Sequence, residues 1–166
     1  MNLPVILLKG IILLPNNEIK LEVDNDFSKN ILEVSELFHE NKVLVINQNN
    51  PLEEAPTLSE LPKFGVIARI NHKLELPNGK VRIVIEGLTR ARVYGYLNLN
   101  RIDENLESIV LPLENVLLNE NDSNILLKKL KKEIDKYIEE IPYISNSIIE
   151  LIRNEEDLSR LTDIIA

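Results

Sequence analysis

The sequence predicts an α+β fold, in which a β-rich part that forms a small closed or half-closed barrel is followed by a helical subdomain. Three observations carry this prediction. Short segments typical of strands, separated by turn residues, fill most of the first 113 residues. A single helical pattern interrupts them. From Asn121 onward the apolar residues step by three and four instead. We therefore expect a β-rich domain over residues 1–116 and a helical one over residues 117–166.

The composition is that of a soluble globular protein, with 44% hydrophobic and 28% charged residues among 166. The chain has no cysteine, which excludes disulfides, thiolate metal sites and cysteine nucleophiles and favours a reducing, cytoplasmic location. A net charge of −8 argues against a general affinity for nucleic acid or an anionic membrane. Residues 1–100 carry 11 basic against 12 acidic residues, whereas residues 101–166 carry 8 against 15, so the two parts present different surfaces.

The first 23 residues predict strands. Residues 3–8 and 11–14 form an apolar run that is broken at Lys9-Gly10, and we expect both pieces to be buried strands. The run is shorter than the roughly 18–20 residues of a membrane span, and it lacks the basic start and cleavage site of a signal peptide. Residues 18–23 (EIKLEV) alternate polar and apolar, which predicts a half-buried strand with Ile19, Leu21 and Val23 on one face.

A helix is expected over residues 26–40, with Asp26 as its N-cap. Its apolar positions recur at helical spacing and should form one inward stripe: Phe27, Ile31, Val34, Leu37 and Phe38. Residues 42–47 (KVLVIN) then predict a short buried strand, and the proline-containing, acidic residues 48–62 predict an exposed loop.

The clearest local pattern is a long hairpin. Residues 64–76 and 80–87 flank Pro77-Asn78-Gly79, where proline presets the first turn position and glycine adopts the left-handed one. The alternation predicts one strand face made of Val81, Ile83 and Ile85. Later features complete the β-rich part: a bulge or bend at Gly87, another strand over residues 90–97, and a last strand over residues 106–113.

From Asn121 the apolar residues indicate three helices. The first ends at Pro142, and its inward stripe is Leu127, Leu130, Ile134, Tyr137 or Ile138, and Ile141. The second covers about residues 145–153, and the third begins near Asn154 as its cap. Because the third apolar stripe is still running at Ala166, we expect the chain to be a fragment of a longer protein.

The residue patterns of common catalytic sites are missing. His39 and His72 have no ligand-spaced partner, and the five glycines form no phosphate-binding loop. Carboxylate pairs such as Glu53-Glu54 lie in polar surroundings that would not raise their basicity. We therefore expect no catalytic residue, no metal and no cofactor in this chain.

One stretch is basic although the protein is acidic. Residues 63–92 have a local net charge of +5, since Glu75 and Glu86 are outnumbered by Lys63, Arg69, Lys73, Lys80, Arg82, Arg90 and Arg92. Such a surface could track a phosphate backbone, dock an acidic neighbour in an assembly, or be a solvated strand face. The residues alone leave these three interpretations open.

Four motifs, in order, resemble the N-terminal domain of the Lon proteases. They are LPVILLKGIILLP, EIKLEVDNDFSKNILEVSELFHENKVLVINQNN, FGVIARINHKLELPNGKVRIVIEGLTRARV and the tail EEDLSRLTDIIA. Residues 76–79 match the family's hairpin turn, and Arg160, Leu161 and Asp163 are in register with its tail motif. The sequence departs from the family pattern at Lys9-Gly10 and at residues 24–27. The resemblance covers essentially the whole chain.

The resemblance implies a PUA-like pseudobarrel with one inserted helix, followed by a helical subdomain. In Lon proteases this domain precedes an ATPase module and a Ser-Lys peptidase, helps to select unfolded or tagged substrates, and supports a hexamer. The chain is then a non-catalytic part of an ATP-dependent serine endopeptidase. Its expected partners are unfolded or damaged proteins and other subunits of a homo-oligomer, with no membrane partner and nucleic acid unfavoured.

A module that binds many unfolded chains needs exposed apolar patches rather than a deep pocket. The aromatic candidates for such a surface are Phe27, Phe64, Tyr94, Tyr96 and Tyr143. Core packing competes with this role, because a chain with few aromatics tends to bury them. Two other functions stay open: a domain that only oligomerises, or a stand-alone PUA-like protein that binds RNA or a small ligand through the basic hairpin surface of Arg69, Lys73, Lys80, Arg82, Arg90 and Arg92.

Overall fold

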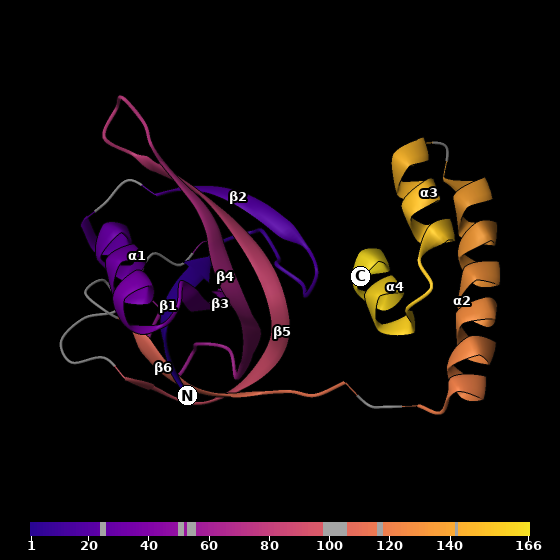
Figure 1. Ribbon diagram of the computed structural model, residues 1–166, viewed down its shortest axis with the longest axis horizontal. Coiled ribbons are helices and arrows are strands. Elements are labelled where there is room, and N and C mark those ends of the chain that lie inside the picture. Colours follow the sequence, from indigo (N-terminus) through magenta and orange to yellow (C-terminus); the bar gives the residue numbers. More distant parts are fainter. Residues whose placement is uncertain (24–25, 50–51, 53–55, 98–105, 116–117, 142) are drawn as a thin grey trace. The chain divides into compact units, whose positions relative to one another are not determined.

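The computed structural model describes residues 1–23, 26–49, 52, 56–97, 106–115, 118–141 and 143–166, with the backbone alone at residues 26–28. The chain forms two compact units, Met1–Glu114 and Asn115–Ala166, and Figure 1 colours them in sequence order from indigo to yellow. The predicted α+β class, with a β-rich part before a helical part, is confirmed. The expected domain boundary between residues 116 and 117 lies outside the described residues.

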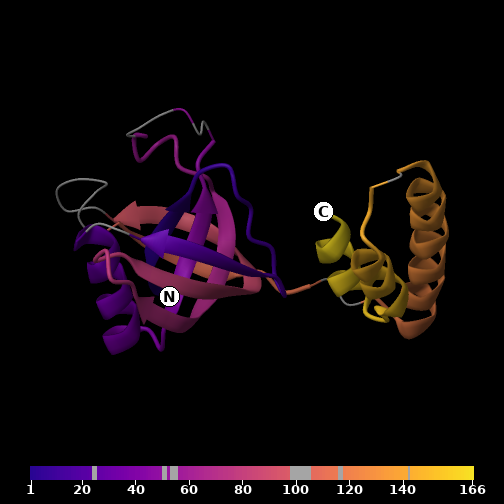
Figure 2. The ribbon, with the colours of Figure 1, turned by 90° about the horizontal axis from the view of Figure 1, so that it is seen from above.

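The first unit is a six-stranded sheet that closes into a barrel. Its elements are β1 (Asn2–Leu8), β2 (Glu18–Val23), α1 (Asp26–Phe38), β3 (Lys42–Asn47), β4 (Phe64–Glu75), β5 (Val81–Leu97) and β6 (Glu107–Pro112). The strands follow the order β2-β5-β4-β3-β1-β6, and a further pairing of β5 with β6 closes the ring. β1 and β3 run parallel, and the other pairs are antiparallel. Figure 2 shows the strands curling around a common interior.

The sheet buries apolar residues on both faces, so the unit has two cores. In β3, Val43 and Val45 lie on one face while Leu44 and Ile46 lie on the other, and all four are buried. The α1-side core consists of Leu8, Leu13, Ile31, Leu32, Val43, Val45, Val66, Ala68, Ile70, Val81, Ile83 and Ile85. The barrel core consists of Leu3, Val5, Leu44, Ile46, Leu61, Ile67, Ala91, Val93, Leu106 and Val110.

The predicted hairpin is confirmed, with β4 and β5 as its strands. Gly79 has a φ of +80°, which is the left-handed conformation that its position in the turn requires. The Leu76 N–H donates to the Lys80 carbonyl at 2.8 Å, and the Gly79 N–H donates to the Leu76 carbonyl at 3.0 Å. Residues 90–97 are not a separate strand, because β5 continues through them.

The predicted bulge next to Gly87 is confirmed as well. Ile67 of β4 pairs with Thr89, whereas the next residue, Ala68, pairs with Gly87. Leu88 is therefore the extra residue of β5. A bulge of this kind increases the local twist and bends the strand. It lets one strand contribute its first half to the α1-side core and its second half to the barrel core.

The prediction of a buried strand over residues 11–14 is wrong. Gly10 turns the chain with a φ of +74°, and residues 11–14 belong to no strand. Leu13 is buried in the α1-side core, whereas Ile11 and Ile12 are exposed. The apolar run therefore marks a segment that covers the sheet rather than a strand within it. We call residues 11–14 the covering segment.

The covering segment is held against the bulge of β5. A Cβ atom on Gly87 would lie only 2.3 Å from the carbonyl oxygen of Leu14, so any larger residue would collide with this backbone. The Gly87 N–H donates to the Asn17 carbonyl at 2.9 Å, and its carbonyl accepts from the Asn16 N–H at 2.8 Å. Glycine at the bulge thus allows two backbone segments to approach closely.

The predicted helix forms, but its inward stripe is narrower than expected. Ile31, Leu32 and Ser35 are buried, while Leu37 and Phe38 are exposed. Leu37 lies about 200° around the helix axis from Ser35, which points it away from the sheet. Phe38 is the last helical residue, next to the chain reversal at residues 40–41, where φ is positive. Asp26 is the first helical residue of α1 rather than the residue before it, and the side chains of Asp26 and Phe27 lie outside the described residues.

The second unit contains three helices: α2 (Glu120–Glu140), α3 (Asn146–Asn154) and α4 (Leu158–Ile165). Side chains at the start of each helix accept a backbone N–H, as N-caps do: Asn119, Ser145 and Asp157. The expected cap of the last helix, Asn154, is instead the final residue of α3. Asp157 replaces it because its carboxylate reaches the Arg160 N–H at 2.8 Å.

The helical unit buries little of its apolar surface. The predicted stripe of α2 is only half-buried and runs through Leu127, Leu130, Ile134 and Ile138, while Tyr137 and Ile141 are exposed. Within this unit's described residues, only Ile152, Leu161 and Asp163 are buried. No helix in the described parts of the chain is long and apolar enough to cross a membrane.

Candidate functional site

Five side chains from three adjacent strands lie on one outer surface of the barrel. Phe64 begins β4 and pairs in register with Arg92 of β5, which in turn pairs with Leu111 of β6. Cross-strand partners project from the same face of a sheet. Ile109 lies two residues before Leu111 and thus on the same face. The Arg92 guanidinium carbon is 5.6 Å from the centre of the Tyr94 ring. We call these five residues the outer face.

The outer face is apolar and open to solvent. Phe64 is 60% exposed, Tyr94 63% and Leu111 51%, and Ile109 is exposed as well. The stacking distance places Arg92 in the range of a cation–π interaction, so that its charge lies over the Tyr94 ring. The register places Arg92 between Phe64 and Leu111, so the exposed apolar side chains lie around one cation. Such a surface can contact side chains of many kinds without a deep pocket.

A groove of about 380 Å³ adjoins the outer face at Phe64. Ile12 and Leu13 line it from the covering segment, and Arg90 and Leu113 line it from the side of β5 and β6. The Leu113 N–H donates to the Arg90 carbonyl at 2.8 Å, which continues the β5–β6 ladder to the groove. We call this hollow the Phe64 groove.

Tyr96 does not belong to the outer face. It pairs with the buried Ser108 and packs half-buried against the barrel core. Its hydroxyl donates to the Pro62 carbonyl, and burial raises the pKa of Tyr96 to about 12. Tyr96 faces the interior because β5 has an irregularity: Val93 pairs with Val110, but Gly95, two residues later, pairs with the adjacent Ile109. Tyr94 and Tyr96 therefore face opposite ways.

The structure does not bring the other two aromatic candidates to this surface. The Phe27 side chain lies outside the described residues. Tyr143 belongs to the helical unit, where it is 93% exposed. Of the five aromatic candidates, only Phe64 and Tyr94 are placed together.

The basic hairpin surface is partly neutralised by acids from other elements. Lys73 forms an ion pair with Glu36 of α1, and Arg82 forms one with Glu22 of β2 at 2.5 Å. Arg69 lies opposite Glu86 in the β4–β5 register. The two remaining arginines lie at the apolar surface: Arg90 lines the Phe64 groove, and Arg92 stacks on Tyr94. The charges therefore do not form a continuous positive strip.

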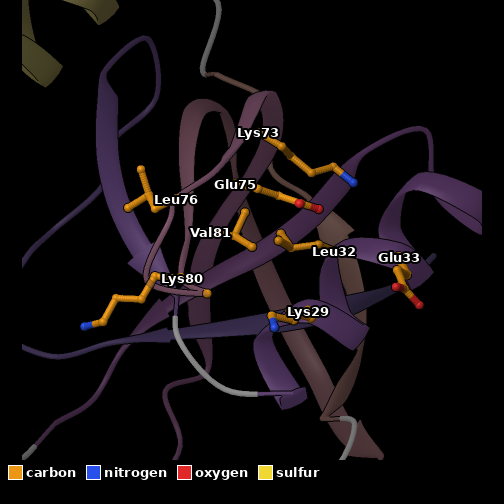
Figure 3. Close-up of a pocket in the computed structure, with 9 residues that line it drawn as sticks. Lys29, Leu32, Glu33, Lys73, Glu75, Leu76, Lys80 and Val81 are labelled. Carbon is orange, nitrogen blue, oxygen red and sulfur yellow. The ribbon is translucent and has the colours of Figure 1, made fainter.

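A second hollow, of about 390 Å³, lies between α1 and the hairpin (Figure 3). Its charged lining mixes both signs: Lys29, Glu33, Lys73, Glu75 and Lys80. Figure 3 shows the Lys80 ammonium pointing away from Lys73 and Glu75, so the charges do not converge on one point. Among the described residues, no three His, Cys, Asp or Glu side chains are grouped to hold a metal ion. This hollow lacks the convergent groups of an ion site.

Sequence reasoning did not identify four residues of this region: Ile12, Ile109, Leu111 and Leu113. A signal for two of them was present. Ile109-Val110-Leu111 is continuously apolar, and only Val110 can point into the barrel if the strand alternates. For Ile12 the sequence held no such signal, since an apolar run does not reveal whether it forms or covers a strand.

Comparisons with known proteins agree on one family. Residues 2–166 match the family described as the ATP-dependent protease La (LON) substrate-binding domain. The Lon proteases of Brevibacillus choshinensis and Escherichia coli (strain K12) are 30% and 27% identical to it over 164 residues, which is 99% of this chain and 20% of each relative. The chain thus spans about a fifth of the length of these curated relatives.

Two solved structures share the fold. The N-terminal domain of the Mycobacterium avium complex Lon protease has a TM-score of 0.62 at 18% identity, covering 99% of this chain and 96% of that one. The Lon N-terminal domain protein from Xanthomonas campestris has a TM-score of 0.57 at 16% identity with the same coverage.

Proposed function

The chain belongs to the family of Lon substrate-binding domains, and on this premise we propose that the outer face and the Phe64 groove bind apolar side chains of unfolded or damaged proteins. The main observation behind this proposal is that Phe64, Tyr94 and Leu111 are exposed around Arg92 on three adjacent strands. Soluble proteins expose large apolar patches mainly where they bind something. An open groove admits side chains of several sizes, which suits recognition of many sequences.

The larger protein that this domain serves is an ATP-dependent Lon protease in the cytoplasm. Its relatives with this domain carry that name, and the domain occupies about a fifth of their length. In the proposed whole protein, an ATPase module and a Ser-Lys peptidase unfold and cut the polypeptide that this domain holds. Assembly into a hexamer raises the effective concentration of the binding surfaces, so each one needs only a weak affinity.

A second candidate function is assembly without substrate contact. It is favoured by the helical unit, where Ile148, Leu151 and Tyr143 are exposed and few residues are buried. Such a surface gains free energy when another helix covers it. RNA binding has less support, because Lys73 and Arg82 already pair with carboxylates.

Fluorescence anisotropy separates these functions. A labelled, permanently unfolded polypeptide is titrated with the full 166-residue chain, with a folded protein and a single-stranded RNA as parallel probes. Saturable binding of the unfolded polypeptide that tolerates salt supports the proposal. RNA binding that weakens steeply with salt, without polypeptide binding, contradicts it. Sedimentation of the chain alone tests assembly.

Matched variants locate the binding surface. Phe64→Ser and Tyr94→Ser remove exposed side chains of the outer face, and each is expected to weaken polypeptide binding by about tenfold, equivalent to about 1.4 kcal/mol. Leu74→Ser is the control, since Leu74 is an equally exposed apolar residue near the hairpin tip. Equal effects of all three substitutions would place the binding surface elsewhere.

A further inference from the structure

β2 is the one strand of the described sheet that pairs on a single side. Its register with β5 is unbroken over six residue pairs, from Glu18 opposite Glu86 to Val23 opposite Val81. The ring of the other strands is closed by the β5–β6 pairing. Natural proteins usually protect an edge with a proline, a bulge, a covering element or charged side chains, above all lysine. Of these devices, β2 carries the exposed charges of Glu18, Lys20 and Glu22. Residues 18–23 contain no proline or glycine and no register shift, so the edge of β2 is regular.

The free edge carries a row of backbone donors and acceptors. Gly87 donates its N–H to the Asn17 carbonyl, and this bond sets residues 17 and 87 at a hydrogen-bonded position of the register that continues along β2. Such pairs alternate with pairs whose N–H groups point outward. The outward N–H and C=O groups of β2 therefore belong to Glu18, Lys20 and Glu22. These groups are spaced to bond an extended backbone, which is the geometry of strand addition.

An apolar hollow lies beside this edge. It measures about 330 Å³ and lies between β1, β2 and α1. Most of its lining is apolar: Leu21 and Val23 of β2, Ile6 and Ile11 from the side of β1, and Ile31 of α1. Two charged residues, Lys9 and Glu22, line it as well. A strand added to β2 would project every second side chain toward this side of the sheet. The hollow, which we call the β2 groove, has room for a large apolar side chain of such a strand.

The solvent-facing side of β2 carries two carboxylates, Glu18 and Glu22, and one cation, Lys20, between them. Glu18 lies directly opposite Glu86 in the β2–β5 register, and like charges in this position destabilise a pair. Glu22 is already paired with Arg82. Glu18 forms no ion pair with any residue in the described part of the chain. A lysine or arginine on the outward face of an added strand would offset the two carboxylates.

We propose that an extended polypeptide segment pairs with the edge of β2 as an added strand, places an apolar side chain in the β2 groove, and presents a basic residue to Glu18. This inference rests on the proposed function, because it adds a backbone-reading site for the same unfolded partner. Alternating apolar residues in an extended segment are normally buried in a folded sheet core. An unfolded chain offers both these side chains and an unpaired backbone along its length, so the site favours unfolded over folded proteins.

The test uses a labelled peptide of about ten residues, the upper end of ordinary strand length, in which valine and isoleucine alternate with threonine and lysine. Two versions are N-methylated at alternate residues, each blocking the donors along one edge. Binding to the full chain is followed by anisotropy. We expect one methylated version to bind about tenfold more weakly than the parent and the other to bind like it, because one row of hydrogen bonds and the fit of the strand are lost.

A pair of variants tests the protein side of the contact. Lys20→Pro removes an outward N–H while leaving the bonds to β5, and an edge strand tolerates proline at such a position. It is expected to weaken parent-peptide binding by about tenfold, whereas Lys20→Ala, which removes the same charge but keeps the N–H, is expected to stay within about twofold. If Lys20→Pro fails to fold, binding of the methylated peptides to the unaltered chain still tests the proposal.

The inference is overturned if the parent peptide does not bind, or if both methylated versions bind as well as the parent. Its failure differs from failure of the proposed function. If methylation has no effect but Phe64→Ser still weakens binding of the unfolded polypeptide, only the β2 site is lost. If the unaltered chain binds neither the unfolded polypeptide nor the peptide, both are lost.

Discussion

The two units of the chain differ in how much core they build for themselves. Among the described residues, the β-rich unit holds twenty-two buried hydrophobic residues and the helical unit holds two. The sheet achieves this because its strands are apolar on both faces, as in β3. The helices achieve less because each presents one apolar stripe and α2 buries none of its residues completely. The barrel therefore contains its own stabilising contacts, whereas the helical unit leaves most of its apolar side chains at least partly exposed.

The sharpest way to break this comparison is to truncate one core residue in each unit. Leu44→Ala is expected to lower the free energy of unfolding by about 2–5 kcal/mol, because Leu44 is completely buried in the barrel core. Leu130→Ala in α2 removes a half-buried side chain and is expected to cost about 1 kcal/mol. Urea denaturation measures both. Equal losses would mean that the helical unit has a core as effective as the barrel's.

A smaller effect is expected where the barrel's backbone segments touch. Gly87→Ala places a Cβ against the Leu14 carbonyl and should cost about 1–3 kcal/mol, since the crowded backbone must shift. Gly95→Ala is the control, because an added Cβ there meets nothing within 4 Å. It should change stability by no more than about 0.5 kcal/mol. If thermal unfolding shows the two variants to be alike, the close approach does not contribute to the barrel.

For the helical unit, capping should matter more than its small core suggests. Asp157→Ala removes the carboxylate that accepts the Arg160 N–H and is expected to cost about 1 kcal/mol. Hydrogen exchange should show faster opening of α4 while the barrel amides are unchanged. Asn154→Ala is the matched control because Asn154 ends α3 and caps nothing. A loss of protection in both units would show that they unfold together.

The last effect concerns Tyr96 and is confined to high pH. Burial raises the pKa of Tyr96 from 10.0 to about 12, so the folded state holds its phenolic proton more tightly than the unfolded state. The resulting stabilisation is complete below about pH 10 and is lost as the pH rises toward 12. Urea denaturation at several pH values should show this decline in the unaltered chain. The Tyr96→Phe variant should lose less stability over this pH range, because it has no phenolic proton to release. If the variant and the unaltered chain lose the same stability, the effect of Tyr96 burial is disproved.

Local patterns predicted most of the strands and helices because their period and turn residues act over a few neighbours. Residues 42–47 and the hairpin around Gly79 are examples. The prediction for residues 11–14 was wrong for a physical reason. An apolar run is equally compatible with a strand inside a sheet and with a segment that packs against the sheet. Leu37 and Phe38 at the end of α1 were predicted to face inward but are exposed. Helical spacing does not show where the surface that packs against the helix ends.

The binding surface was only half predictable, because strand register and one irregularity decide it. Strict alternation along β5 would place Tyr94 and Tyr96 on the same face. The irregularity between Val93 and Gly95 turns Tyr96 into the barrel core and leaves Tyr94 outside. The neighbourhood of Phe64 and Leu111 depends on pairing between residues far apart in the chain, and this pairing leaves no local trace in the sequence.

The hydrogen bonds that hold the covering segment in place also affect the entropy lost when a polypeptide binds. Asn16 and Asn17 bond to Gly87 at one end of the segment, and the Asn47 side chain donates to the Ile11 carbonyl at the other. A wall that is ordered before a ligand arrives loses little conformational entropy on binding. In the Phe64 groove, most of the conformational entropy lost on binding is therefore lost by the incoming polypeptide. A chain that is already extended should therefore be captured more tightly than an equally apolar chain that is collapsed.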